Sequence, residues 1–257
     1  MYQTVLITGA SSGIGKALAE LFAAEPYNLV LVSRTESDLK ATKSLLEAKY
    51  TSTVTVIPME LSINESPDLL LDTLNRLGIM IDVLVNNAGF GLHGPFAESS
   101  WMDEMEMINL HVRNLTYLTK RLLPGMLERR CGGILNVVST AAFQPGPLMA
   151  VYYATKSYTL SLTEALACEL KDTHIRVTAL CPGPTETRFS QRANLNKVKL
   201  FAMGQMNANR VAKEGFAGFK RGKTVVIPGI RNRLLAASIR VAPRNIVTAI
   251  VKYLHQT

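Results

Sequence analysis

The sequence predicts an α/β fold in which one doubly wound parallel sheet of about seven strands carries helices on both faces. The first observation behind this prediction is that short apolar runs alternate with stretches of helical periodicity along all 257 residues. Parallel strands joined by crossover helices produce that alternation. The second is that the chain shows no internal repeat, low-complexity tract or linker. We therefore expect residues 1–257 to form a single domain, with strands near Val5, Leu29, Val54, Val83, Ile134, Val177 and Val225.

A glycine-rich turn follows the first expected strand. The apolar residues 5–7 lead into Thr8–Gly15 (TGASSGIG), and helical spacing of apolar residues begins at Ala17. A strand, a glycine-rich turn and a helix N-terminus together form an anion site, because unpaired N–H groups and the helix dipole point at a phosphate. We expect the phosphates of a dinucleotide to be held by Gly9, Ser11, Ser12, Gly13, Ile14 and Gly15.

The end of the second expected strand indicates which dinucleotide is bound. Enzymes that use NAD carry an acidic residue here for the ribose 2′-hydroxyl, whereas this chain has Ser33 and Arg34. A guanidinium can hold a 2′-phosphate that a carboxylate would repel, so the predicted cofactor is NADP(H). In the alternative, Arg34 is a solvated loop residue and Glu36 or Asp38, both inside the next expected helix, binds the ribose.

Tyr152 and Lys156 are four residues apart, so in a helix both side chains lie on one face. An ammonium beside a phenol favours the phenolate and is expected to lower the tyrosine pKa from its usual value of about 10. Such a tyrosine can give a proton to a carbonyl oxygen and take it back. On its own, the pair would be interpreted as two surface residues; the glycine turn and the motifs that follow favour a catalytic pair.

The chain resembles the single-domain short-chain dehydrogenase/reductase family over almost its whole length. Besides the glycine turn, four features carry the resemblance: residues 86–89 (NNAG) after an apolar strand, Asn109 in a helical segment, Ser139 thirteen residues before Tyr152, and residues 182–187 (PGPTET). The resemblance implies a Rossmann fold, and the chain's ending is similar to a subgroup of bacterial reductases and hydroxysteroid-dehydrogenase-like enzymes. One departure is Glu60-Leu61, which stands where the family usually has Asp and an apolar residue near the adenine.

The resemblance also implies roles for particular residues. Tyr152 would be the general acid in reduction and the base in oxidation, Lys156 would lower its pKa and hold the nicotinamide ribose, and Ser139 would donate to the substrate carbonyl. Asn109 would order a water between Lys156 and solvent. Further cofactor contacts are implied for Glu60, Leu61, Asn87, Ala88, Gly89, Pro182, Gly183, Thr185 and Thr187.

Two other residues near the expected site have competing interpretations. Tyr153 is the alternative acid, but it is three residues from Lys156 rather than four, and its face is expected to turn inward to packing. His93 is expected in a loop or in the substrate pocket. We expect no metal site, because Cys131, Cys168 and Cys181 lack metal-ligand spacing.

The predicted substrate is a medium to large hydrophobic ketone, aldehyde or alcohol. Residues 188–223 are expected to roof the pocket, and their apolar members, half of which could instead be helix core, are Phe189, Leu195, Val198, Leu200, Phe201, Met203, Met206, Val211, Phe216 and Phe219. The expected opposite wall comprises Phe90, Leu92, Phe143, Pro145, Leu148 and Met149.

Charge is distributed unevenly along the chain. Residues 1–187 contain 14 Lys/Arg and 19 Asp/Glu, a net charge of −5, whereas residues 188–257 contain 14 Lys/Arg and only Glu214, a net charge of +13. A basic region attracts anions such as NADPH, a coenzyme A thioester or an acidic acyl carrier protein. Residues 228–257 are expected to form a basic helical extension, for which core packing or a subunit interface is favoured over peripheral membrane contact.

The remaining expectations concern partners and location. No nucleic-acid reading module accompanies the positive charge, so nucleic-acid binding is not predicted. The helices after Ser100 and Val151 suggest a homodimer. An odd number of cysteines, no apolar stretch of about 20 residues and an early first strand suggest a cytoplasmic protein. The alternative function is a catalytically silent NADP(H) sensor that acts through its basic C-terminal region.

Overall fold

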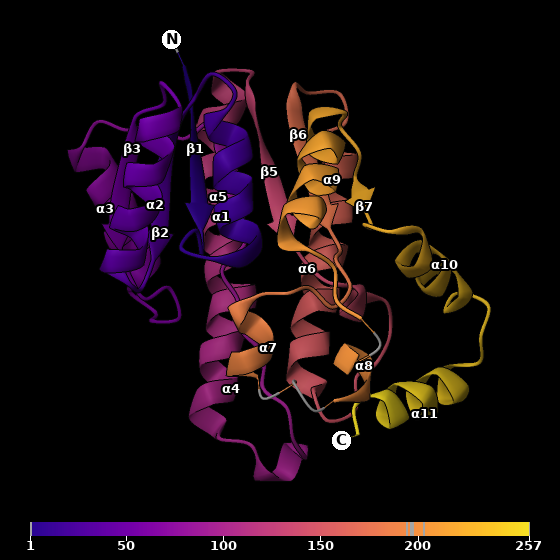
Figure 1. Cartoon of the computed structure of the whole chain (residues 1–257). Helices are drawn as coiled ribbons and strands as arrows, with labels where there is room; N and C mark the ends of the chain where they lie inside the picture. The colour runs from indigo at the N-terminus through magenta and orange to yellow at the C-terminus, as the bar shows by residue number, and fades with distance from the viewer. Residues whose placement is uncertain (1, 194, 196–197, 203, 257) are drawn as a thin grey trace.

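The computed structural model describes residues 2–193, 195, 198–202 and 204–256, and its centre is one sheet of seven parallel strands (Figure 1). The strands are β1 (Gln3–Thr8), β2 (Tyr27–Ser33), β3 (Val54–Pro58), β4 (Val83–Asn86), β5 (Gly132–Val137), β6 (Ile175–Leu180) and β7 (Val225–Val226). Their order is β3-β2-β1-β4-β5-β6-β7, and every pair is parallel. The predicted fold class and all seven strand positions are confirmed.

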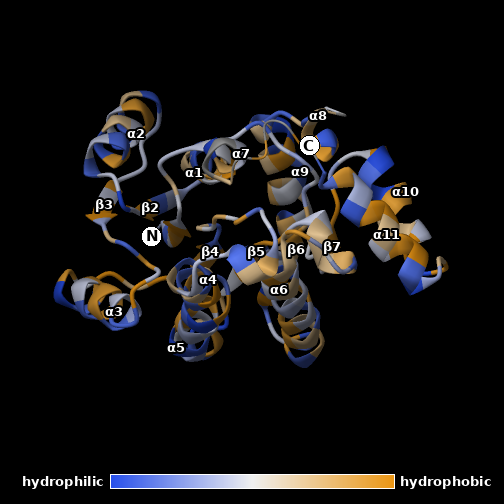
Figure 2. Cartoon of the chain, turned by 90° about the horizontal axis from the view of Figure 1, so that it is seen from below, coloured by the Kyte–Doolittle hydropathy of each residue, from blue (hydrophilic) through white to orange (hydrophobic). Residues whose placement is uncertain are grey.

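Helices cover both faces of the sheet, as Figure 2 shows from below. On one face lie α1 (Gly13–Ala23), α2 (Glu36–Lys49) and α9 (Ala208–Lys220). On the other lie α3 (Ser66–Arg76), α4 (Trp101–Ile108), the π-helix η2 (Asn109–Asn114), α5 (Leu115–Glu128) and α6 (Ala150–Glu169). Two short 3₁₀ helices, η1 (Phe96–Glu98) and η3 (Thr140–Phe143), lie in the connections after β4 and β5.

The strands form because their residues are apolar and face helices on both sides, which is typical of a parallel sheet. Val83, Leu84 and Val85 of β4 are buried, as are their aliphatic register partners, so the centre of the sheet excludes water; these partners are Val5, Leu6 and Ile7 on β1 and Ile134 and Leu135 on β5. On the α1 side, the ring of Phe22 packs edge-on against Phe216 at a centroid distance of 4.8 Å and close to Phe219. This aromatic cluster fixes α9 against α1.

The predicted pocket roof at residues 188–223 is only partly correct. Its second half is α9, whose residues Val211, Phe216 and Phe219 belong to the core with Phe22, so it covers the sheet rather than the pocket. The first half contains α7 (Arg188–Arg192) and α8 (Lys199–Ala202), which lie over the carboxyl ends of the strands (Figure 1). We call the described residues of this half, 188–193, 195 and 198–202, the lid. Met203, which was expected in the roof, lies outside the described residues.

Residues 228–256 form the predicted helical extension, with α10 (Ile230–Ser238) and α11 (Arg244–Leu254) beyond the β7 edge of the sheet (Figures 1 and 2). The buried side of α11 presents Val247 and Val251 to a cluster that includes Tyr152, Tyr153 and Phe201. The chain after α11 therefore returns to the pocket. Among the described residues, none of the helices has the length and apolar character that crossing a bilayer requires.

Candidate active site

Nearly all of the predicted site residues line one cleft at the carboxyl ends of the strands. This position is expected for a doubly wound sheet, whose ligands bind where the strand order reverses, here between β1 and β4. The predicted residues that line the cleft are Gly9, Ser11, Ser12, Gly13, Ile14, Ser33, Arg34, Glu60, Leu61, Asn87, Ala88, Gly89, Ser139, Tyr152, Lys156, Pro182, Gly183, Thr185 and Thr187.

Gly15 and Asn109 are the two predicted residues that do not line it. A Cβ atom on Gly15 would lie 2.3 Å from Asn87 Nδ2 and 2.3 Å from the Gly9 carbonyl oxygen, so this glycine permits close packing beneath the turn. Asn109 is half-buried at the first residue of the π-helix η2, next to Leu110, which does line the cleft. Its expected water-ordering role stays a prediction.

The glycine turn is held against β4 by hydrogen bonds. Asn87 Nδ2 donates to the carbonyl oxygens of Thr8 (2.9 Å) and Gly9 (3.1 Å), and the backbone N–H groups of Asn87 and Ala88 both donate to Thr8 Oγ1 at 3.0 Å. Gly9 has a φ of +65°, and a Cβ atom there would lie 2.8 Å from Ala88 Cα. Glycine is therefore required at this position on two grounds.

The N-terminus of α1 fits the pyrophosphate of a dinucleotide. Ser12 is the N-cap but makes no side-chain cap hydrogen bond, and the first turn contains no acidic residue. The N–H groups of that turn and the positive end of the helix dipole therefore face the cleft without a competing negative charge. A Cβ atom on Gly13 would lie 2.8 Å from Thr187 Cγ2, so the start of the lid contacts the glycine turn.

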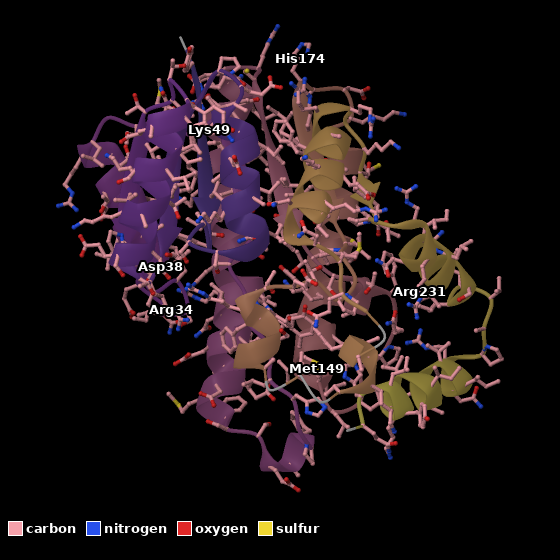
Figure 3. All side chains as sticks on the ribbon, viewed as in Figure 1. Arg34, Asp38, Lys49, Met149, His174 and Arg231 are labelled. Atoms are coloured by element: carbon pink, nitrogen blue, oxygen red, sulfur yellow. The ribbon has the colours of Figure 1, made fainter. Side chains whose placement is uncertain are left out.

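The end of β2 fits a 2′-phosphate. Ser33 Oγ is buried, lines the cleft and has no hydrogen-bond partner among the described residues. Arg34 follows it, half exposed, and its Nε lies 3.2 Å from Glu60 Oε2. Figure 3 shows Arg34 and Asp38 near each other at this end of the sheet. An unpartnered hydroxyl beside a guanidinium is suited to receive an anion.

The two acids that could have bound the ribose are engaged elsewhere. Glu36 Oε1 lies 2.7 Å from Lys40 Nζ, one helical turn further along α2. Asp38 Oδ2 accepts a hydrogen bond of 2.5 Å from Arg188 Nη1, at the start of α7. Glu36 does not line the cleft, and Asp38 ties α2 to the lid. This geometry favours the interpretation in which Arg34 faces the ribose.

Tyr152 and Lys156 lie side by side in the first two turns of α6. Both side chains are buried, at 8% and 7% exposed, and Lys156 Nζ lies 5.7 Å from the centroid of the Tyr152 ring. Lys156 Nζ donates to the Val137 carbonyl oxygen at 3.1 Å, which joins α6 to the end of β5. Ser139, two residues after that strand, accepts a hydrogen bond from the Ala141 N–H at 3.1 Å.

The predicted lowering of the Tyr152 pKa is not what the structure shows. Burial raises the pKa of Tyr152 to about 12, and a hydrogen bond with the Ser139 side chain only partly opposes this. Burial also lowers the pKa of Lys156 to about 8. Desolvation disfavours the charged form of each group and exceeds the attraction that the spacing of four residues suggested. At neutral pH the phenol is therefore protonated and able to donate.

His111 is a neighbour of the site that sequence reasoning missed. Its ring lies 6.0 Å from the Tyr152 ring, it is 2% exposed, and burial holds its pKa well below the usual value. Its Nε2 accepts from the Phe90 N–H at 3.2 Å, so the neutral ring carries its proton on Nδ1, which lies 3.0 Å from Thr155 Oγ1. The Thr155 hydroxyl in turn donates to the Tyr152 carbonyl at 2.8 Å. His111 thus joins the loop after β4 to the first turns of α6, which carry Tyr152.

The apolar wall of the cleft is smaller than predicted. From the lid it includes Phe189, Leu195, Leu200 and Phe201, and from the expected opposite wall only Met149, whose position is labelled in Figure 3. The Phe189 ring lies 5.3 Å from the Tyr152 ring. The other expected wall residues lie elsewhere, because the chain turns away from the cleft there: Leu92 and Leu148 line a second hollow, Phe143 and Pro145 line a third, and Phe90 is core.

Tyr153 and His255 were not predicted to line the cleft, but both do. The expected inward packing of Tyr153 is correct in part, since the ring is 5% exposed, but its hydroxyl lies 2.6 Å from His255 Nε2. His93 lies in the loop after β4, and its Nε2 lies 2.8 Å from the His255 carbonyl oxygen. No local pattern marks His255, because its position depends on how α11 packs.

Comparisons with known proteins agree with this geometry. A family model for short chain dehydrogenases matches residues 3–198. The ketoacyl reductase HetN of Nostoc sp. is 32% identical over 82% of this chain and 74% of its own length. A very-long-chain 3-oxoacyl-CoA reductase of Phaeosphaeria nodorum is 34% identical over 67% of this chain, which spans about half (52%) of that protein. The solved structure of a short-chain dehydrogenase from Sphingobium yanoikuyae in complex with NADPH is 30% identical, with a TM-score of 0.84 over 95% of each chain.

Proposed function

The chain belongs to the short chain dehydrogenase family, and from this we propose that it interconverts a hydrophobic ketone or aldehyde and its alcohol with NADP(H). The observation that carries the proposal is the meeting of Tyr152, Lys156 and Ser139 in one buried corner of the cleft whose other end fits a phosphorylated dinucleotide. A binding protein without chemistry has no need of a desolvated acid beside a desolvated amine.

The residues at this corner divide the work of reduction. Tyr152, which burial keeps protonated, gives its proton to the oxygen of the carbonyl group as negative charge develops there. The Ser139 hydroxyl donates to the same oxygen and stabilises that charge. When bound, the nicotinamide cofactor supplies or accepts the hydride. Lys156, anchored by the Val137 carbonyl, keeps an ammonium beside the phenol and favours its brief ionisation.

The same groups predict different pH dependences for reduction and for oxidation. Oxidation of an alcohol needs Tyr152 as a base, and the raised pKa of this phenol makes the phenolate scarce near pH 7. Reduction needs the phenol itself, which is the abundant form. We therefore expect oxidation to gain from a rise in pH much more than reduction does.

The proposed cofactor preference depends on the end of β2. Arg34 and the unpartnered Ser33 hydroxyl offer a guanidinium and a hydroxyl to a 2′-phosphate. The two acids of α2 that could bind a 2′-hydroxyl, Glu36 and Asp38, are engaged by Lys40 and Arg188. The solved relative that contains NADPH supports this choice. The proposed cofactor is therefore NADP(H) rather than NAD(H).

The substrate class is proposed from the lid and from the relatives. Phe189, Leu200, Phe201 and Met149 give the cleft an apolar wall beside Tyr152, which suits an apolar substrate body. The named relatives act on ketoacyl and 3-oxoacyl compounds, whose acyl chains are apolar. A polyhydroxylated sugar would leave many hydroxyl groups without partners against this wall.

The test is NADPH oxidation, followed by absorbance, with a panel of apolar ketones of increasing size and one sugar ketone. We expect turnover that grows with the apolar surface of the ketone, little turnover with the sugar, and turnover about 10³-fold lower in Tyr152→Phe. A protein that binds NADPH but reduces no ketone of a broad panel would contradict the proposal and favour the NADP(H) sensor.

We also propose a homodimer formed through α4 and α6. Trp101 and Met102, at the start of α4, are 71% and 68% exposed, and Tyr158 on α6 is 39% exposed. Large apolar side chains gathered on neighbouring helices are typical of an interface. Size-exclusion chromatography with light scattering should give twice the chain mass, and Trp101→Lys should shift the population toward the monomer.

A further inference from the structure

We infer that His255 binds a second oxygen atom of the substrate, a neutral carbonyl distinct from the one that is reduced. The inference rests on the proposed function, because it concerns the pocket beside Tyr152. It comes from one hydrogen-bonding atom: His255 Nδ1 is buried and has no partner among the described residues, although His255 lines the cleft.

Hydrogen bonds to several elements fix the position of His255. Its N–H continues α11 by donating to the Val251 carbonyl at 3.0 Å, and its own carbonyl lies 2.8 Å from His93 Nε2. The next residue, Gln256, accepts from the Lys199 N–H of the lid at 3.3 Å. The imidazole is 1% exposed. The loop after β4, α6 and the lid therefore converge on this residue.

The hydrogen-bond arrangement assigns the proton to Nδ1. Burial raises the pKa of Tyr153 and lowers the pKa of His255 to about 4, so the phenol is protonated and the imidazole is neutral. If the Tyr153 hydroxyl donates to Nε2, the only unmet group is an N–H on Nδ1. If Nε2 donated instead, both the hydroxyl proton and a bare Nδ1 would lack partners. The first arrangement leaves fewer buried groups unsatisfied and is the favoured one.

An unpaired, buried N–H donor beside a ligand cavity fits an acceptor that arrives with the ligand. The imidazole is neutral, and the titratable groups bonded to His255 are Tyr153 and His93, neither of which provides a fixed positive charge. The Lys199 backbone bonds Gln256, but the Lys199 ammonium lies over the Tyr253 ring, 4.3 Å from its centroid. A neutral carbonyl of a ketone, ester or thioester suits this donor better than a carboxylate, whose burial there would be costly.

The position of the donor also restricts where the second oxygen lies. The Tyr153 ring contacts both of the groups that would bind the two substrate oxygens. Its centroid lies 6.1 Å from that of the Tyr152 ring and 5.4 Å from that of the His255 ring. The reacting carbonyl faces Tyr152, so the second carbonyl is on the far side of Tyr153, with apolar lid residues beside the chain that joins them. The inferred substrate is therefore bifunctional.

The experiment measures binding without turnover. Calorimetry with NADPH-saturated Tyr152→Phe compares a long-chain ketone with oxo-esters of the same length that carry the methyl ester two, four or six carbons from the ketone. We expect one oxo-ester to bind about tenfold more tightly than the plain ketone, the size of one well-placed hydrogen bond. The corresponding free acid should bind no better than the ester.

Two substitutions at His255 separate the two ring nitrogens. His255→Asn keeps an N–H near the position of Nδ1 and should retain most of the tenfold preference. His255→Gln keeps a polar group near Nε2 for Tyr153 but has no atom at Nδ1, and should bind the oxo-ester and the ketone equally. Thermal unfolding of both variants checks that they are folded.

If the variants do not fold, ¹⁵N NMR of the wild-type histidines gives the answer. The Nδ1–H tautomer of His255 should be observed, and its resonance should move when the oxo-ester is added. The inference is wrong if no oxo-ester is preferred, if the preference survives in His255→Gln, or if that resonance does not move. These outcomes are independent of the proposed function, which fails if the wild type does not oxidise NADPH with any ketone.

Discussion

The cofactor side of the cleft and its substrate side differ in how far their residues come from one another in the sequence. On the cofactor side, the lining residues lie in short stretches at the ends of strands: the turn after β1, Ser33 and Arg34 at the end of β2, and Asn87 after β4. On the substrate side, one hydrogen-bonded cluster joins His93, Tyr153 and His255, which come from three distant segments. The first side can be found from local motifs, whereas the second exists only after α11 has packed.

The N-terminal and C-terminal regions of the chain carry opposite net charges, and the structure brings some of those charges into contact. Residues 1–187 have a net charge of −5 and residues 188–257 one of +13. Ion pairs between described residues join the regions, among them Arg188 with Asp38 at 2.5 Å and Lys220 with Glu25 at 2.8 Å. Glu214, the only acid of the second region, lies 3.3 Å from both Arg210 and Arg233. Part of the charge asymmetry therefore attaches the lid and α9 to the sheet.

Substitution of two adjacent tyrosines of α6 should separate the effects of the reacting group from those of the substrate side of the cleft. Tyr152→Phe should lower kcat by about 10³-fold, because it removes the general acid, and should leave the affinity for NADPH unchanged. Tyr153→Phe is the matched control: it should lower kcat less than about tenfold and change mainly the KM of large ketones, because its hydroxyl contacts His255 rather than the reacting group. Steady-state kinetics and NADPH titration measure both. Equal losses of kcat in the two variants would contradict the separate roles proposed for Tyr152 and Tyr153.

The next largest effect is expected at the end of β2. Arg34→Leu should weaken NADPH binding by about 30-fold, as expected for losing one charge-assisted contact with a phosphate, and should leave NADH binding nearly unchanged. Glu60→Gln is the complementary variant. It frees Arg34 from the 3.2 Å ion pair, so NADPH should bind a few times more tightly. Fluorescence titration with both cofactors measures the ratio, and an equal loss of NADPH and NADH affinity in Arg34→Leu would remove the role given to this residue.

Features set by local sequence could be predicted, whereas features set by tertiary packing could not. The seven strands and the residues that line the cofactor end of the cleft follow from local patterns, because a close backbone approach requires glycine and a parallel strand requires apolar residues wherever they occur. Gly15 was placed among the contacts although its lack of a side chain serves packing against Asn87. The sign of the Tyr152 pKa shift was wrong because spacing reveals a neighbour but not burial. His111, His255 and the true extent of the lid depend on tertiary packing, which no local motif records.

The buried Lys156 is expected to lower the stability of the folded protein at neutral pH. Lys156 has a pKa of about 8 in the folded protein and one of about 10.4 when unfolded, so folding must bury an ammonium at neutral pH. Lys156→Met should therefore raise the free energy of unfolding at pH 7 by about 2 kcal/mol, after allowing for the lost bond to the Val137 carbonyl. It should also abolish turnover.

The destabilising effect of Lys156 should decrease as the pH rises. Between pH 8 and 10.4 the unfolded chain binds more protons at Lys156 than the folded protein does, so this residue makes the wild type more stable as the pH rises. The advantage of Lys156→Met should shrink over that range. Urea unfolding at pH 7 and pH 10 measures it. A methionine variant less stable than the wild type at pH 7 would show that the ammonium stabilises the fold instead.

The smallest expected effect lies where the two sides of the cleft meet. Asp38→Asn removes the negative charge that pairs with Arg188 at the start of the lid. The Arg188 side chain in this ion pair is 67% exposed. Exposed pairs contribute little, so the melting temperature should fall by no more than about 2 °C. The KM for the ketone should rise about twofold, because Arg188 no longer ties the start of the lid, next to Phe189, to α2. Glu36→Gln, which breaks the Lys40 pair within α2, is the matched control and should leave KM unchanged. A KM that responds equally to both changes would mean that Asp38 acts through α2 and that the two sides of the cleft are joined by packing alone.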